Sequence, residues 1–170
     1  MAIPVSLRRG GEVVGIIEGM SVPGGKVVIV EDDPLLVRAY HEALTAKGFE
    51  VETFFNAEDA YSAIREMRQK PGMILTDIMM PKMNGLQFLE KLQESPVLRK
   101  IPVIVMTSLS QVEHAEKARS LGAVAYLVKD QHTMKEMVEK VEEFTGPGLV
   151  DAPLETGVVD RDLDNKTKNT

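Results

Sequence analysis

The chain contains no cysteine among its 170 residues. Disulfide scaffolds, thiolate ligands for zinc or iron–sulfur clusters and thiol nucleophiles are therefore excluded. No run of about 18 apolar residues occurs, so we expect no membrane-spanning helix and, by default, a cytoplasmic protein. Positive charge is in the minority, with 20 basic against 26 acidic residues and a net charge of −6. This balance argues against nucleic acid as the main partner.

Composition divides the chain into three zones. Residues 1–25 hold six glycines and no sustained hydrophobic period, and we expect an N-terminal extension of unknown role there. Residues 26–145 carry the periodic segments and are predicted to form the folded domain. Residues 146–170 open with Gly-Pro-Gly and continue with five acidic and three basic residues, which is typical of a polar C-terminal tail.

Short apolar runs alternate with amphipathic helical patterns in the middle zone. The predicted strands are Lys26–Val30, Glu50–Phe54, Met73–Thr76, Ile101–Met106 and Val124–Val128. Predicted helices run from Pro34 to about Lys47, after Asn56, from about Leu86 to Glu94, from Ser110 to Gly122 and after Thr133. The pairs Ser110/Glu113 and Thr133/Glu136 have capping-box spacing. Strict alternation predicts an α/β fold with a doubly wound, five-stranded parallel sheet.

Polar side chains follow four of the predicted strands. Glu31 and Asp32 follow the first strand, Asp77 the third, Thr107 the fourth and Lys129 the fifth. The carboxyl ends of parallel strands meet at one edge of the sheet, where ligands bind in open α/β folds. Carboxylates brought together there need a cation, and a hard divalent ion such as Mg²⁺ fits oxygen ligands.

The same set of residues favours phosphoryl transfer. A lysine supplies a point charge to a phosphate oxygen, and a threonine hydroxyl can donate to another. Carboxylates serve as covalent phosphoryl acceptors, which makes Asp77 the candidate nucleophile. Taken singly, however, Asp32 and Asp33 before Pro34 equally fit a helix cap, and Asp77 equally fits a turn. The joint spacing favours the functional interpretation.

Four motifs in order carry a resemblance to a known family. They are VVIVEDDP at the first strand, ILTDIMMPKMNG around Asp77, VIVMTS at the fourth strand and AYLVKD at the fifth. Their intervals are 45 residues from Asp32 to Asp77, 30 to Thr107 and 22 more to Lys129. Over about residues 26–145 the sequence resembles a receiver domain of two-component response regulators, of the chemotaxis-receiver type. The resemblance implies a flavodoxin-like (βα)5 fold with strand order 2-1-3-4-5.

The resemblance also implies a phosphoacceptor site. Asp77 would accept a phosphoryl group from the phosphohistidine of a sensor histidine kinase or a phosphotransfer protein. Asp32 and Asp77 would hold Mg²⁺, with Glu31 acting mainly through a bridging water and Met79 lending its backbone carbonyl. The protein would then be a phosphoacceptor that dephosphorylates itself, and not a turnover enzyme.

A switch is implied as well. Lys129 would pair with the phosphorylated aspartate, Thr107 would move towards the phosphoryl oxygen, and Tyr126 would be the aromatic switch residue. The surface of the fourth helix, fifth strand and fifth helix, about residues 110–144, would then contact an unidentified downstream protein. Pairing of two copies through this surface on activation stays open.

One residue departs from the family pattern. The family places proline after its lysine, joined by a cis peptide bond, whereas this chain has Asp130. A cis bond before a residue other than proline costs about 2.5–4 kcal/mol. We therefore expect a rearranged or trans link, which can shift the ammonium of Lys129.

Three rival functions are weaker. A phosphatase with an aspartyl nucleophile places it after the first strand, whereas Asp77 follows the third. A nucleotide-binding domain would need a glycine-rich phosphate loop. The chain has no G-x-G-x-x-G motif after its first predicted strand and no P-loop in register. A receiver that serves only as a scaffold would not be phosphorylated. Because only 25 residues follow position 145, we expect a stand-alone receiver, with a fragment of a larger regulator or hybrid kinase as the alternative.

Overall fold

The computed structural model describes residues 8–9, 12–13 and 25–145. Two short strands, β1 (Arg8–Arg9) and β2 (Glu12–Val13), pair antiparallel within the N-terminal zone. The predicted polar tail, residues 146–170, lies outside the described residues. Within the described part of the chain, no helix is both long enough and apolar enough to cross a membrane.

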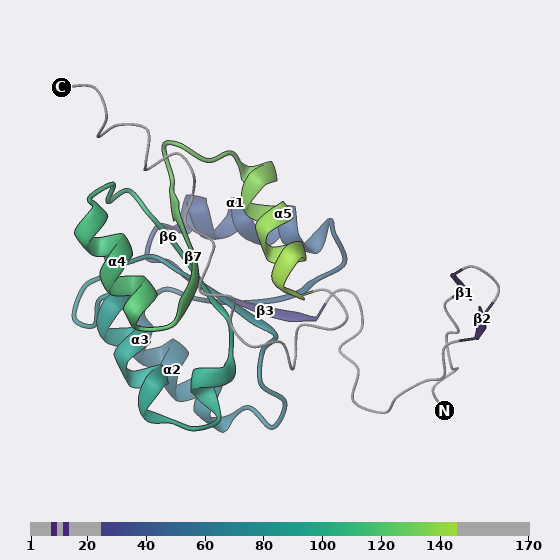
Figure 1. Cartoon of the computed structure of the whole chain (residues 1–170), viewed down its shortest axis with the longest axis horizontal. Coiled ribbons are helices and arrows are strands. Elements are labelled where there is room, and N and C mark those ends of the chain that lie inside the picture. Colours follow the sequence, from purple (N-terminus) through teal and green to yellow (C-terminus); the bar gives the residue numbers. More distant parts are fainter. Residues whose placement is uncertain (1–7, 10–11, 14–24, 146–170) are drawn as a thin grey trace.

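Residues 26–128 contribute a five-stranded sheet (Figure 1). Its strands are β3 (Lys26–Val30), β4 (Glu50–Phe54), β5 (Met73–Thr76), β6 (Val103–Thr107) and β7 (Ala123–Val128). Neighbouring strands pair parallel throughout, in the order β4-β3-β5-β6-β7. Numbered along the sheet's own strands this is 2-1-3-4-5, so the predicted topology is confirmed.

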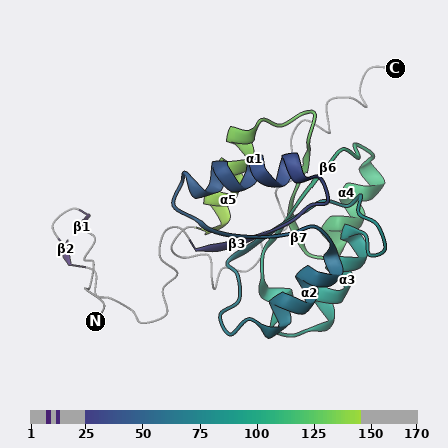
Figure 2. The same cartoon turned by 180° about the vertical axis from the view of Figure 1, so that it is seen from behind.

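Helices cover both faces of this sheet. The helices are α1 (Pro34–Thr45), α2 (Ala57–Glu66), α3 (Gly85–Glu94), α4 (Val112–Ser120) and α5 (Met134–Thr145), with a 3-10 turn at Leu98–Lys100. Figures 1 and 2 show α1 and α5 on one face and α2, α3 and α4 on the other. The sheet is therefore the middle of three layers, as the alternating sequence pattern predicts.

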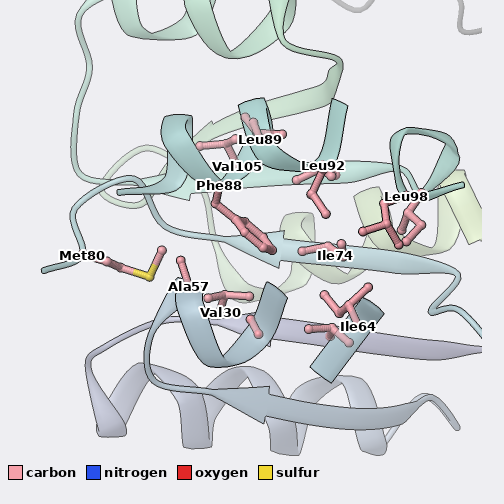
Figure 3. Close-up of a cluster of buried hydrophobic side chains, with 14 of the residues drawn as sticks. Val30, Ala57, Ile64, Ile74, Met80, Phe88, Leu89, Leu92, Leu98 and Val105 are labelled. Atoms are coloured by element: carbon pink, nitrogen blue, oxygen red, sulfur yellow. The ribbon is translucent and has the colours of Figure 1, made fainter. Parts of the chain in front are cut away.

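The apolar side chains of β3 divide between the two faces. Val27 and Ile29 belong to the core under α1 and α5, and Val28 and Val30 belong to the core under α2, α3 and α4. In the second core, Phe88 projects from α3 towards the sheet and is fully buried (Figure 3). A strand covered on both faces has no solvent side, which explains why its sequence is continuously apolar.

Helix caps follow the predictions in two of three cases. The side chain of Asn56 accepts from the backbone N–H of Asp59 at 2.8 Å. Thr133 and Glu136 form the predicted capping box: the Glu136 N–H donates to the Thr133 hydroxyl, and the Thr133 N–H donates to the Glu136 carboxylate. These bonds satisfy backbone donors that the first helical turn leaves free.

The capping box predicted at Ser110 is wrong. Helix α4 starts at Val112, and Gln111 occupies the cap position without a side-chain hydrogen bond. The backbone carbonyl of Gln111 accepts the first helical hydrogen bonds, which places Glu113 one residue too early to reach back as a capping box requires.

Several element boundaries differ from the predictions by one to two residues. Helix α1 ends at Thr45 and not near Lys47, and Gly48 follows with a φ of +87°, a conformation that glycine adopts without steric cost. Strand β6 begins at Val103 and not at Ile101, because Ile101 closes the 3-10 turn and Pro102 has no N–H for a sheet ladder.

Candidate functional site

Strand register brings the predicted site residues to one edge of the sheet. Val30 lies beside Thr76, so the next residues, Glu31 and Asp77, are neighbours, and the Asp77 N–H donates to the Val30 carbonyl at 3.0 Å. On the other side of β5, β6 ends at Thr107, whose carbonyl accepts from the Lys129 N–H at 2.9 Å. Residues that lie far apart in the chain thus meet because parallel strands end together.

Three carboxylates form the core of the site. Glu31, Asp32 and Asp77 each offer an oxygen, and these oxygens lie within 4.8 Å of one another. Glu31 and Asp77 are buried, with 2% and 6% exposure, whereas Asp32 is exposed. Burial raises the pKa of Glu31 because it penalises the charged form, and the Lys129 ammonium only partly offsets this effect.

Asp33, the remaining acidic residue after β3, has a different position. Its carboxylate accepts from the backbone N–H groups of Leu35 at 2.8 Å and Leu36 at 3.4 Å. Asp33 therefore caps α1, while the adjacent Asp32 joins the acidic cluster. The structure thus separates two functions that the sequence left open for the pair.

The Lys129 ammonium bridges two of the carboxylates. Its Nζ donates to Glu31 Oε2 at 2.7 Å and to Asp77 Oδ2 at 2.8 Å. Burial acts to lower the pKa of Lys129, but the hydrogen bonds to Asp77 and Glu31 outweigh it and the pKa is raised. The ammonium is therefore held charged beside the acceptor candidate.

The expectation of a trans link between Lys129 and Asp130 is confirmed. The link is trans, since no cis peptide bond occurs among the described residues. The ammonium still reaches the acceptor candidate, because Nζ lies 2.8 Å from Asp77 Oδ2. The long lysine side chain reaches both carboxylates from a strand end that β6 holds in place.

The second oxygen of Asp77 is held by the backbone that follows it. Asp77 Oδ1 accepts from the N–H of Ile78 at 2.6 Å and of Met79 at 3.2 Å. Met79 is 60% exposed, so its side chain is not part of the core, whereas the neighbouring Met80 is buried. Both oxygens of Asp77 therefore have donors, and the carboxylate is fixed in orientation.

Thr107 and Tyr126 are connected through one residue between them. The fully buried Thr107 accepts at Oγ1 from the Leu109 N–H at 3.4 Å, and the Tyr126 hydroxyl donates to the Leu109 carbonyl at 2.8 Å. Burial, together with the Asp77 charge, raises the pKa of Tyr126 to about 12. The predicted switch residues therefore both hydrogen-bond to Leu109, in the loop between β6 and α4.

The donor set fits a divalent metal ion. One ammonium offsets one of the three carboxylate charges, and the two that remain match the charge of a divalent cation. Hard oxygen ligands in this number suit Mg²⁺, which usually takes one or two carboxylates and completes its coordination with water and substrate phosphate. The acidic cluster can therefore hold a metal of the predicted kind.

Comparison with known proteins identifies the family. The family model for the response regulator receiver domain matches residues 27–142. The chain belongs to this family. Its order of strands and its acidic edge are those of a receiver domain, a module of two-component signalling whose members are typically phosphorylated on aspartate.

Relatives of very different length share this receiver domain. The gliding motility regulatory protein of Myxococcus xanthus is 33% identical over 71% of this chain, and the chain spans only 15% of that protein. The polar-differentiation response regulator DivK of Brucella anthropi is 32% identical over 71% of the chain and 95% of its own length. A receiver domain of a histidine kinase from Syntrophus aciditrophicus has a similar structure, with a TM-score of 0.64, 28% identity and coverage of 71% of this chain and 89% of its own.

Sequence reasoning missed the capping box at the start of α3, which lies beside the site. Asn84 caps α3 in a capping box with Gln87, in which the Gln87 N–H donates to Asn84 at 2.9 Å and the Asn84 N–H donates back to the Gln87 side chain at 3.0 Å. The Asn-x-x-Gln spacing before an apolar helix face is a signal that could have revealed it. The box sets the first turn of α3 directly behind Asp77, since the Gly85 N–H donates to the Ile78 carbonyl.

Proposed function

We propose that Asp77 accepts a phosphoryl group from the phosphohistidine of a sensor kinase or phosphotransfer protein. The observation that carries this proposal is the placement of a buried carboxylate, Asp77, between the Lys129 ammonium and two backbone N–H groups. A carboxylate oxygen attacks phosphorus, an O–P bond forms, and the P–N bond to the donor imidazole breaks. The product is an acyl phosphate on Asp77.

The chain's own residues orient the acceptor and balance charge. The N–H groups of Ile78 and Met79 hold one carboxylate oxygen, and the Lys129 ammonium lies beside the other. In phosphoryl transfer, such positioning and neutralisation account for most of the catalysis. Lys129 remains charged because its pKa is raised, so it can pair with the phosphoryl oxygens that the reaction adds.

Asp32, Asp77 and the backbone carbonyl of Met79 would hold Mg²⁺, with Glu31 acting through water. Both Glu31 oxygens accept hydrogen bonds, one from Lys129 and one from the Asp33 N–H at 3.2 Å, and these bonds hold Glu31 beside the other two carboxylates. When bound, the ion supplies neutralisation of charge on the transferring phosphoryl group.

The phosphoryl group would be sensed by Thr107 and Tyr126. Thr107 is the last residue of β6 and accepts from the Leu109 N–H, and the Tyr126 hydroxyl donates to the Leu109 carbonyl of the same loop. Movement of Thr107 would disturb this loop and with it the start of α4. The surface of α4, β7 and α5 would then change its affinity for a downstream protein or for a second copy of the chain, by a shift in populations.

Intact mass measured after incubation with acetyl phosphate and Mg²⁺ tests the acceptor. We expect the wild type to gain the mass of one phosphoryl group, and Asp77→Asn to gain none. The matched control is Asp33→Asn, which makes the same change at an acid that only caps α1 and whose amide oxygen can still accept from Leu35. This variant should be modified like the wild type.

Four outcomes would contradict the proposal. Unmodified wild type would leave a scaffold receiver, and modified Asp77→Asn would place the acceptor elsewhere. Sustained hydrolysis of small phosphoesters by the wild type would indicate a phosphatase instead. Modification that persists in full after chelation of divalent ions would contradict the metal site.

A further inference from the structure

Gly85, the first residue of α3, lies against the backbone of the acceptor candidate. A Cβ atom at this position would be 2.1 Å from the Asp77 carbonyl oxygen, 2.9 Å from its carbonyl carbon and 2.9 Å from the Ile78 Cα. All three atoms belong to the main chain, so no side chain can rotate away to make room. Among the described glycines with a close contact, this one alone meets backbone within 3 Å.

The helix that carries Gly85 is firmly held. Phe88, Leu89 and Leu92 of α3 are buried in the core between the sheet and the helices α2, α3 and α4 (Figure 3). The capping box of Asn84 and Gln87 fixes the first turn. A Cβ at position 85 would therefore act mainly on the segment it meets, which is Asp77 and Ile78, because moving α3 would disrupt a packed core.

That segment also orients the Asp77 carboxylate. Oδ1 accepts from the N–H of Ile78 at 2.6 Å and of Met79 at 3.2 Å, and the Gly85 N–H donates to the Ile78 carbonyl at 3.0 Å. A displaced main chain would carry both donors with it and alter the direction in which the carboxylate points. The backbone path behind Asp77 is thus coupled to the geometry of the acceptor.

We propose that Gly85 is a positioning residue for phosphoryl transfer: the absence of a side chain at Gly85 lets α3 contact the main chain of Asp77, and this contact aims the acceptor carboxylate. The inference rests on the proposed function of Asp77. Gly85 itself touches neither phosphorus nor metal and acts through Asp77 and Ile78.

The test compares Gly85→Ala with two control variants. Gly72→Ala makes the same change where the nearest atom to a new Cβ, the Lys26 carbonyl oxygen, is an ordinary 3.8 Å away. Leu92→Ala removes a buried side chain of the same helix, and so weakens the fold without adding an atom behind Asp77. Each variant is assayed with acetyl phosphate and Mg²⁺ at a temperature below its own melting transition.

We expect Gly85→Ala to be phosphorylated slower by on the order of a hundredfold, the size of effect that a misplacement of about 1 Å produces. Gly72→Ala and Leu92→Ala should keep the wild-type rate while folded. Alanine in a helix normally stabilises relative to glycine, so a lower melting temperature for Gly85→Ala would itself report the steric contact. A wild-type rate in folded Gly85→Ala, or an equal loss in Leu92→Ala, would overturn the proposal.

A second readout does not depend on phosphorylation. The backbone amide resonances of Ile78 and Met79 report their hydrogen bonds to Asp77, and we expect them to shift in Gly85→Ala but not in Gly72→Ala. If the wild type were not phosphorylated, the function proposed for Asp77 would fail, while these resonances would still decide whether Gly85 sets the carboxylate. Unshifted resonances would overturn the positioning effect.

If Gly85→Ala does not fold at low temperature, Asn84→Ala/Gln87→Ala decides the question. This double variant removes the capping box, so the first turn of α3 is free to move away from Asp77 without any added atom. We expect the same two resonances to shift and the phosphorylation rate to fall. Unchanged resonances with an unchanged rate would overturn the proposal.

Discussion

At the scale of single residues, the site is built from oppositely charged groups that share a small buried volume. Lys129 lies between Glu31 and Asp77, and its hydrogen bonds to them outweigh the effect of burial on the pKa of its ammonium. Removing one partner of such a set leaves the others uncompensated, so each member depends on the rest. Burial and the Asp77 charge also raise the pKa of Tyr126, and a pH titration measures this effect directly.

Tyr126 should ionise well above the ordinary range for tyrosine. Its pKa is raised from 10.0 to about 12, first by burial and then by the Asp77 charge. The neutral phenol is therefore favoured in the folded state, and the stability it contributes is present below pH 10 and is lost as the pH rises towards 12. The difference in phenolate absorbance between wild type and Tyr126→Phe, followed against pH, should have its midpoint near 12.

A midpoint near 10 in that titration would contradict the placement of Tyr126. Tyr126→Phe also removes the hydrogen bond to the Leu109 carbonyl, so its unfolding at neutral pH serves as the control for the lost bond. The alkaline loss of stability between pH 10 and 12 should be smaller in the variant than in the wild type.

At the scale of elements, capping side chains decide where the helices begin. Helices α1, α2 and α3 have caps whose side chains accept backbone N–H groups, whereas Gln111 before α4 does not. Short polar residues make these bonds because their oxygen lies close to their own main chain, and glutamine is longer. The start of α4 is therefore less firmly defined by local bonds than the others, in the segment that the proposed switch would move.

Asn56→Ala should lower the free energy of unfolding by about 1 kcal/mol, because it removes an N-cap bond. Gln111→Ala, a matched change at a cap without a side-chain bond, should change it by less than about 0.5 kcal/mol. Urea denaturation of the two variants and the wild type measures both values. Equal losses in the two variants would contradict the difference between the caps.

At the scale of the whole molecule, the sheet separates two cores, and Asp77 lies at its edge between them. The core under α2, α3 and α4 includes Phe88 and extends from Val30, next to the acidic cluster, to Leu98 at the other end of the sheet (Figure 3). Packing along this length holds α3 behind Asp77. This core therefore stabilises the helix whose first residue, Gly85, lies against the main chain of Asp77.

Phe88→Ala should lower the free energy of unfolding by about 3–5 kcal/mol, because a fully buried ring is lost and a cavity remains. Phe55→Ala makes the same change at a ring that is 51% exposed, and its cost should be within about 1 kcal/mol. Denaturant midpoints for the two variants provide the comparison. Similar costs would contradict the predicted place of Phe88 in the core.

Sequence alone determined the fold class and the residues of the acidic edge, and the resemblance gave the strand order. Both the hydrophobic period and the spacing of motifs can be read directly along the chain. The period of the apolar runs is visible residue by residue, and Asp32, Asp77 and Lys129 follow strand ends whatever the tertiary detail. The predicted box at Ser110 failed because local capping rules favour Ser110, whereas α4 begins one residue later, after Gln111.

Only the tertiary structure decided how these residues divide their work. It placed Asp33 on the α1 cap and Asp32 in the acidic cluster, brought the Lys129 ammonium to both Glu31 and Asp77, and set Gly85 against the main chain of Asp77. The Lys129 contacts depend on distances between segments far apart in the chain, which sheet register fixes, and the Gly85 contact depends on how α3 packs. A pattern along the sequence carries no such distances.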